Sequence, residues 1–135
     1  MNNTIRISCN KKNLKLIRDF VTGYLSTYNL SEIVVNQMVL AVDEICANLI
    51  IHANQENENK FLTLSILHKN NSYLFEICDE GKSFSQVNYK EPNIQDNIRQ
   101  GKKGGVGIAL VNRIMDRVEF HTTNGHNICR LYKKA

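Results

Sequence analysis

The apolar residues of this 135-residue chain follow two different periods in separate stretches. Residues 4–9 alternate between apolar and polar side chains, which predicts a half-buried strand. Between Lys12 and Tyr28 apolar residues recur every three or four positions, so an amphipathic helix is expected there. The alternating runs Leu62–His68 and Tyr73–Asp79 predict a hairpin with a four-residue turn.

A second helix is expected from Ser31, a suitable N-cap, to about Ala53. Apolar residues surround nearly its whole circumference, which is typical of a buried helix. Glu44, Asn48 and His52 nevertheless occur on it, each four residues after the last. At about 100° per residue these three side chains would share one stripe. A polar stripe on a buried helix is the first candidate for chemistry.

The last third of the chain predicts a loop, a helix and a second hairpin. Residues 80–104 are polar and lack periodicity. So long a loop in a compact domain indicates either a functional lid, which we place at about residues 82–104, or a wrongly assigned element. Gly107–Met115 is expected to be helical, and Arg117–Thr122 with Ile128–Lys133 should form a closing hairpin. Strands and helices come in separate runs. The predicted class is therefore α+β: one domain, a two-layer sandwich with helices on one face of a mostly antiparallel, mixed sheet.

The composition and net charge limit the classes of function that we expect for this chain. Apolar residues make up 42% of the chain and charged residues 22%, as in an ordinary globular domain. No run of about 18 apolar residues lacks charge, and the start does not resemble a signal peptide, so we expect a cytoplasmic protein without a membrane partner. The net charge of +4 is low for a DNA-binding protein, but it suits a nucleotide or an acidic protein. The four cysteines lack metal-ligand spacing.

The first motif is the pair Glu44 and Asn48 on the buried helix. A buried carboxylate needs a partner, water or a ligand site beside it. The pair could offer a base and an amide oxygen to a magnesium nucleotide. Taken alone, the motif is explained more simply as a polar stripe satisfied by neighbouring loops.

The second motif comprises Asp79, Gly81 and Phe84 at the end of a predicted strand. An aspartate there can accept hydrogen bonds from an exocyclic amine, and the glycine lets the backbone approach a flat ring. The alternative is an ordinary Asp-x-Gly turn.

The third motif is a run of glycines at 104, 105 and 107, directly before a helix. Backbone N–H groups at such a helix start can converge on an anion, and Lys102 and Lys103 precede them. The spacing is neither that of a Walker A loop nor that of a Rossmann fingerprint. The alternative here is a flexible hinge.

Together E-x-x-x-N, D-x-G-x-x-F and G-x-G-x-x-L, in this order, resemble the N, G1 and G2 boxes of the GHKL ATPases. That superfamily includes the gyrase, histidine-kinase and mismatch-repair ATPases. The resemblance covers essentially the whole chain. Within the superfamily, AVDEICANLIIHA and GGVGIALVNRIMDRVEF are most similar to the anti-sigma-factor serine/threonine kinases, free-standing bacterial domains of this size.

The resemblance implies bound ATP and Mg²⁺ and a role for each motif. Glu44 would be the general base for a substrate serine, Asn48 would hold the magnesium, and Asp79 would read the adenine amine. Gly81 would lie against the ring. The implied nucleotide-binding residues are Asn48, His52, Asp79, Gly81, Phe84, Lys102, Lys103, Gly104, Gly105, Val106, Gly107 and Leu110. The candidates for contact with the γ-phosphate are Arg99, Lys102 and Lys103.

By the same resemblance the protein would be a homodimeric switch. It would bind a sigma factor in one state and phosphorylate a serine of a STAS-domain anti-sigma-factor antagonist in another. In this chain Gly125-His126 replaces the family's Gly-Thr, which bears on nucleotide preference. Two other hypotheses are an ATP-sensing binding module without transfer and an interaction scaffold that binds no ATP.

Overall fold

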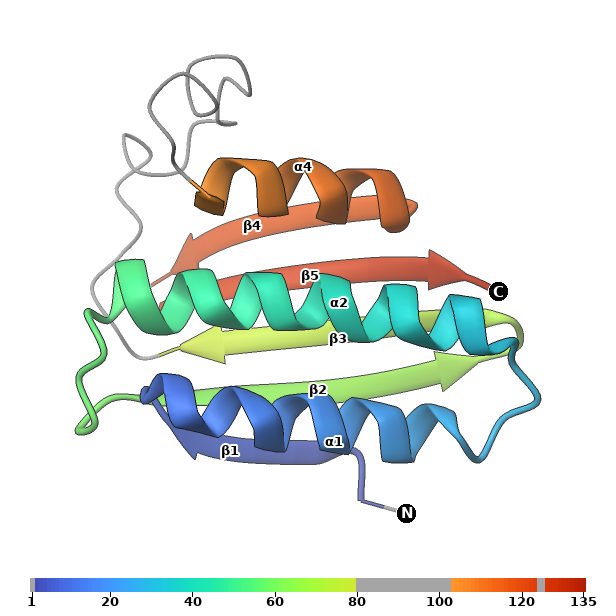
Figure 1. Cartoon of the computed structure of the whole chain (residues 1–135), viewed down its shortest axis with the longest axis horizontal. Coiled ribbons are helices and arrows are strands. Elements are labelled where there is room, and N and C mark those ends of the chain that lie inside the picture. The colour runs from blue at the N-terminus through green and yellow to red at the C-terminus, as the bar shows by residue number, and fades with distance from the viewer. Residues whose placement is uncertain (1, 80–102, 124–125) are drawn as a thin grey trace.

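The computed structural model describes residues 2–79, 103–123 and 126–135, and it shows two layers: helices above one face of an antiparallel sheet (Figure 1). The predicted α+β class is confirmed. The strand order is β1-β2-β3-β5-β4, and every described pair of neighbours is antiparallel, so the mixed component of the prediction is not observed there. The strands are β1 (Thr4–Ser8), β2 (Phe61–Lys69), β3 (Ser72–Asp79), β4 (Arg117–Thr123) and β5 (His126–Lys134).

The helices largely follow the sequence periodicity. Ser31 caps the second helix as predicted, because its Oγ accepts a hydrogen bond from the Val34 N–H at 3.2 Å. The first predicted helix is shorter than expected, since it ends at Leu25 rather than Tyr28. The helical elements are η1 (Lys11–Asn13), α1 (Leu14–Leu25), α2 (Glu32–Asn48), the π-helical η2 (Leu49–Ala53) and α4 (Lys103–Ile114).

The last helix begins earlier than predicted. α4 starts at Lys103, four residues before Gly107, so Lys103 and Gly104 belong to the helix and not to the predicted lid. The remainder of that lid, residues 82–102, lies outside the described residues.

The first hairpin has a shorter turn than predicted. Lys69 pairs with Ser72, which leaves a two-residue turn in place of the expected four. Asn70 has a φ of 57°, and asparagine tolerates this left-handed conformation better than most residues.

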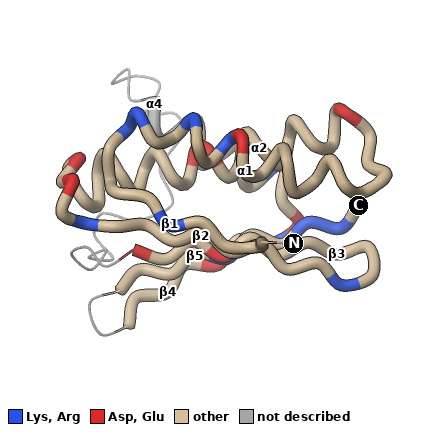
Figure 2. Tube along the Cα trace, turned by 90° about the horizontal axis from the view of Figure 1, so that it is seen from below, with Lys and Arg blue, Asp and Glu red and all other residues tan. Residues whose placement is uncertain are grey.

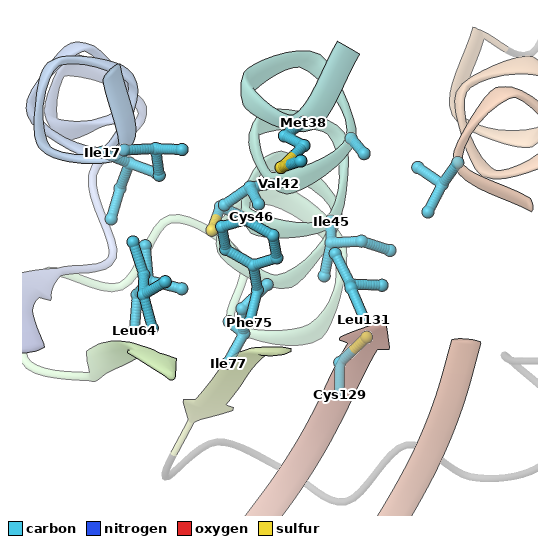
Figure 3. Close-up of a cluster of buried hydrophobic side chains, with 14 of the residues drawn as sticks. Ile17, Met38, Val42, Ile45, Cys46, Leu64, Phe75, Ile77, Cys129 and Leu131 are labelled. Carbon is cyan, nitrogen blue, oxygen red and sulfur yellow. The ribbon is translucent and has the colours of Figure 1, made fainter. Parts of the chain in front are cut away.

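The core lies between the sheet and α2, the central helix of the layer (Figure 3). Tyr73, Phe75 and Ile77 of β3 alternate inward, and Asp79 takes the next inward place at the strand end. On the paired strand Asn127 occupies the place directly opposite Asp79. Figure 3 labels the surrounding side chains of Ile17, Met38, Val42, Ile45, Cys46, Leu64, Cys129 and Leu131.

The opposite face of the sheet is not covered by the described helices (Figure 2). Ion pairs lie across this face, with Arg130 Nε 2.9 Å from Glu76 Oε2 and Arg117 Nη2 2.6 Å from Glu119 Oε2. Because polar side chains occupy this side of the sheet, the predicted alternation of buried and exposed positions along the strands is confirmed.

The span Glu32–Ala53, which joins α2 and η2, is long and apolar enough to cross a membrane by length and composition. In this fold it lies over the middle of the sheet, between α1 and α4 (Figure 1). A central core helix is apolar for the same reason, so this one span is weak evidence for a membrane protein.

The buried face of α2 can be tested with two isoleucines on the same helix. Ile45→Ala should lower the free energy of unfolding by about 2–5 kcal/mol, because Ile45 is fully buried and its removal leaves a cavity. Ile33→Ala is the control, since Ile33 is 71% exposed and its loss should change stability by less than about 0.5 kcal/mol. Urea denaturation measures both. Equal effects would contradict the placement of α2.

Candidate nucleotide-binding site

Four chain segments meet at one end of the domain. The end of α2, the end of β3, the start of β5 and the start of α4 lie together there (Figure 1). Three of the four carry a residue of the sequence motifs: Asn48 on α2, Asp79 on β3 and Gly107 on α4. The fold therefore brings together motifs that are far apart in the sequence.

Asp79 forms the deepest part of this site. It is only 1% exposed, and donors from two different elements meet its carboxylate. Asn54 Nδ2 donates to Oδ2 at 2.7 Å, and the Asn127 N–H donates to Oδ1 at 3.2 Å. These two hydrogen bonds, one to each carboxyl oxygen, fix the orientation of the Asp79 side chain.

The π-helical turn η2 places Asn54 beside Asp79. Both the backbone N–H and Nδ2 of Asn54 donate to the Leu49 carbonyl oxygen, at 3.0 and 2.8 Å. The backbone bond joins residues five apart, the spacing of a π-helix, and such turns occur frequently at functional sites. One amide thus bridges the end of α2 and the end of β3.

The π-helical turn η2 also shortens the predicted polar stripe. The expectation that Glu44, Asn48 and His52 share one face assumed a continuous α-helix, but the α-helical hydrogen bonding ends at Asn48. His52 lies in η2 and is exposed. The stripe therefore holds for the first pair only, and a nucleotide contact by His52 stays a prediction.

Glu44 lies against the first turns of α4. A Cβ built on Gly107 would come within 2.8 Å of Glu44 Cδ and closer still to Oε2, so the carboxylate fills the space beside this glycine. Burial, with a smaller contribution from the charge of Asp43, raises the pKa of the Glu44 carboxyl. A glutamate with a raised pKa suits general-base chemistry near neutral pH.

Asn48 has the chemistry of a magnesium ligand. It is 8% exposed, and its Nδ2 donates to the Glu44 carbonyl oxygen at 2.9 Å. The amide oxygen, Oδ1, would then be the atom available to Mg²⁺, which prefers such oxygens. No cluster of three His, Cys, Asp or Glu exists in the described part of the chain.

The remaining predicted residues fall into two groups. The first turn of α4 comprises Lys103, Gly104, Gly105 and Val106, and backbone N–H groups in a first turn have no intrahelical partner and suit an anion. Leu110 lies further along this helix and is exposed. The residues outside the described part of the chain are Gly81, Phe84, Arg99, Lys102 and Gly125.

The sequence analysis did not predict that Asn54 and Asn127 belong to the site. Asn127 could have been found, because it occupies an inward position of the alternating strand that continues with Cys129 and Leu131. Asn54 follows no pattern, since its position depends on the π-helical turn.

A central helix that carries a glutamate and an asparagine, with a buried aspartate at the end of the adjacent strand, defines an ATPase domain of the histidine-kinase type. The chain belongs to the histidine kinase-like ATPase domain family, whose model matches residues 7–133. The match spans nearly the whole chain, as the motif resemblance predicted.

Proteins named serine-protein kinase RsbW are among the relatives. The RsbW of Halalkalibacterium halodurans is 25% identical over 114 residues, which cover 82% of this chain and 69% of that protein. The RsbW proteins of Bacillus thuringiensis and Bacillus cereus are 22% identical over 128 residues, covering 92% of this chain and 79% of theirs. The resemblance to this group of kinases is thereby confirmed.

Two solved structures share the fold. The RsbU and RsbW domains of a Mycobacterium tuberculosis protein superpose with a TM-score of 0.65 at 10% identity, covering 98% of this chain but 32% of that one. The histidine kinase domain of a blue-light-activated histidine kinase from Erythrobacter litoralis superposes with a TM-score of 0.57 at 12% identity, covering 95% of this chain and 61% of that one. This chain therefore spans less than two thirds of either structure.

Two helical glycines provide a test of the contact between α4 and Glu44. Gly23→Ala in α1 should raise the free energy of unfolding by about 0.5–1 kcal/mol, because alanine favours a helix and no atom lies within 4 Å of its new methyl group. Gly107→Ala should gain less, because the methyl group displaces the Glu44 carboxylate. Chemical denaturation compares them, and an equal gain at both positions would contradict the contact.

Proposed function

We propose that this protein is an ATP-dependent serine/threonine kinase of the anti-sigma type. It phosphorylates a serine of a STAS-domain anti-sigma-factor antagonist and binds a sigma factor in its other state. The observation that carries the proposal is that Asp79, which is buried at the end of β3, and Glu44, whose carboxyl has a raised pKa, lie in segments that meet at one end of the domain. The relatives named serine-protein kinases support the serine substrate.

Each side chain has a defined task in this proposal. Asp79 accepts a hydrogen bond from the exocyclic amine of adenine, while Asn54 and Asn127 hold its carboxylate. Glu44 takes the proton of the serine hydroxyl as the serine oxygen bonds to the γ-phosphorus and the bond from that phosphorus to ADP breaks. Mg²⁺, when bound, neutralises phosphate charge, and Asn48 Oδ1 would hold it.

The proposed partners follow from the kinase group that the chain resembles. A homodimer in the cytoplasm, without direct contact to nucleic acid or a membrane, is the assembly we propose. The net charge of +4 suits both a nucleotide and an acidic protein surface.

The base-reading role of Asp79 is tested by isothermal titration calorimetry with Mg-ATP. The wild type should bind, and Asp79→Asn should lose most of its affinity, because an amide cannot offer the amine a charged acceptor. Glu76→Gln is a matched control on the opposite face of the same strand, and it should bind as the wild type does. Equal ATP affinity in Asp79→Asn, with thermal melts showing a folded protein, would contradict the assignment.

The general base is tested with Glu44→Gln. Transfer of radiolabel to a STAS-domain protein should fall by about 10²–10⁴-fold, while ATP binding survives. In the wild type, transfer should be lost as the pH falls through a value above the ordinary glutamate range, because the pKa of Glu44 is raised and the base must be ionised. Transfer at the wild-type rate in the variant would overturn the role.

Stability provides the control for this variant. Since the folded-state pKa of Glu44 is raised, its contribution to stability is present at low pH and lost as the pH rises through that pKa. Glu44→Gln should therefore be at least as stable as the wild type at neutral pH, with the difference vanishing in acid. A loss of transfer could then not be ascribed to unfolding.

A further inference from the structure

One buried acceptor lies next to Asp79 and takes no part in holding its carboxylate. Asn54 is 5% exposed, and its Oδ1 finds no hydrogen-bond partner within the described residues. Its Nδ2 uses two hydrogens, one on the Leu49 carbonyl oxygen at 2.8 Å and one on Asp79 Oδ2 at 2.7 Å. Buried polar groups are nearly always paired, so this oxygen requires a donor.

The orientation of this amide is fixed by its neighbours. If the amide were turned over, Oδ1 would face two acceptors, Leu49 O and Asp79 Oδ2, and both hydrogen bonds would be lost. Nδ2 is therefore the amide atom that contacts the carboxylate, and Oδ1 is bonded to the same carbon as this nitrogen. Covalent geometry then keeps Asn54 Oδ1 beside Asp79.

The carboxylate itself is held from the opposite side. The Asn127 N–H donates to Asp79 Oδ1 at 3.2 Å, and Thr122 Oγ1 donates to Asn127 Oδ1 at 3.1 Å. Asp79 and Asn54 therefore form a rigid pair of acceptors. An exocyclic amine carries two hydrogens, which match two adjacent acceptors.

We propose that Asn54 is a second specificity residue for the base, and this rests on the proposed ATP site. Asp79 takes one hydrogen of the 6-amino group, and Asn54 Oδ1 takes the other, directly or through one water. The pair would favour 6-aminopurines over 6-oxopurines, because the O6 of an oxopurine is an acceptor and would face two further acceptors.

The first test uses the wild-type protein and measures dissociation constants for Mg-ATP, N6-methyl-ATP and ITP. N6-methyl-ATP keeps one amine hydrogen and should bind about tenfold more weakly than ATP, the effect of one hydrogen bond. ITP should bind more weakly still. Equal affinities for ATP and N6-methyl-ATP would overturn the role of Asn54 and leave the proposed ATP site standing. No binding of any nucleotide would overturn both.

The second test asks whether the discrimination depends on Asn54. In Asn54→Ala the affinity for ATP should fall about tenfold, whereas that for the 6-deamino analogue, purine riboside triphosphate, should hardly change. A purely structural role would weaken both nucleotides equally and would overturn the proposal. Asn54→Leu, which keeps the volume, repeats the comparison. Asn59→Leu, at an exposed position of the same loop, is the control and should bind like the wild type. If neither Asn54 variant folds, the N6-methyl-ATP comparison decides.

Discussion

The site depends on one constraint: the carboxylate of Asp79 is buried at the end of a row of inward-facing apolar side chains on β3. Tyr73, Phe75 and Ile77 take the preceding inward places of β3, so the side chain of Asp79 enters the same layer as the core. A buried charge is tolerated only where donors meet it. Here these donors come from the turn after α2 and from the first residues of β5. Asp79 therefore specifies how the turn after α2 and the start of β5 must lie relative to the end of β3.

Much of this arrangement could be predicted from local patterns. Alternation identified the strands, and the all-round apolar surface of α2 identified the central helix. The π-helical turn could not be predicted, because the Asn54 side chain reaches Asp79, 25 residues further along the chain. The start of α4 was also missed, since glycines disfavour a helix in isolation. Packing of α4 on α2 at Gly107 and Glu44 compensates for that local cost.

At Gly107, helix stability competes with the space that the Glu44 carboxylate occupies. Alanine there would favour the helix by about 1 kcal/mol, yet its methyl group would occupy the space of the Glu44 carboxylate. In α1, Gly23 has no such neighbour, so its cost to the helix has no comparable reason. The space beside Gly107 also keeps Glu44 half-buried, and this burial is the main cause of its raised pKa.

Both ends of the site are therefore joined through one rigid element. α2 carries Glu44 and Asn48 at the end that faces α4, and the turn that follows it carries Asn54, which holds Asp79. A tilt of α2 would move Asp79, the proposed base reader, and Glu44, the proposed general base, together. Fully buried residues between these positions, such as Ile45 and Cys46, resist that motion because they are packed against the sheet. In the proposed kinase, the geometry between the base reader and the reacting phosphate would thus be set by the core, and the side chains of the site would take their precision from its packing.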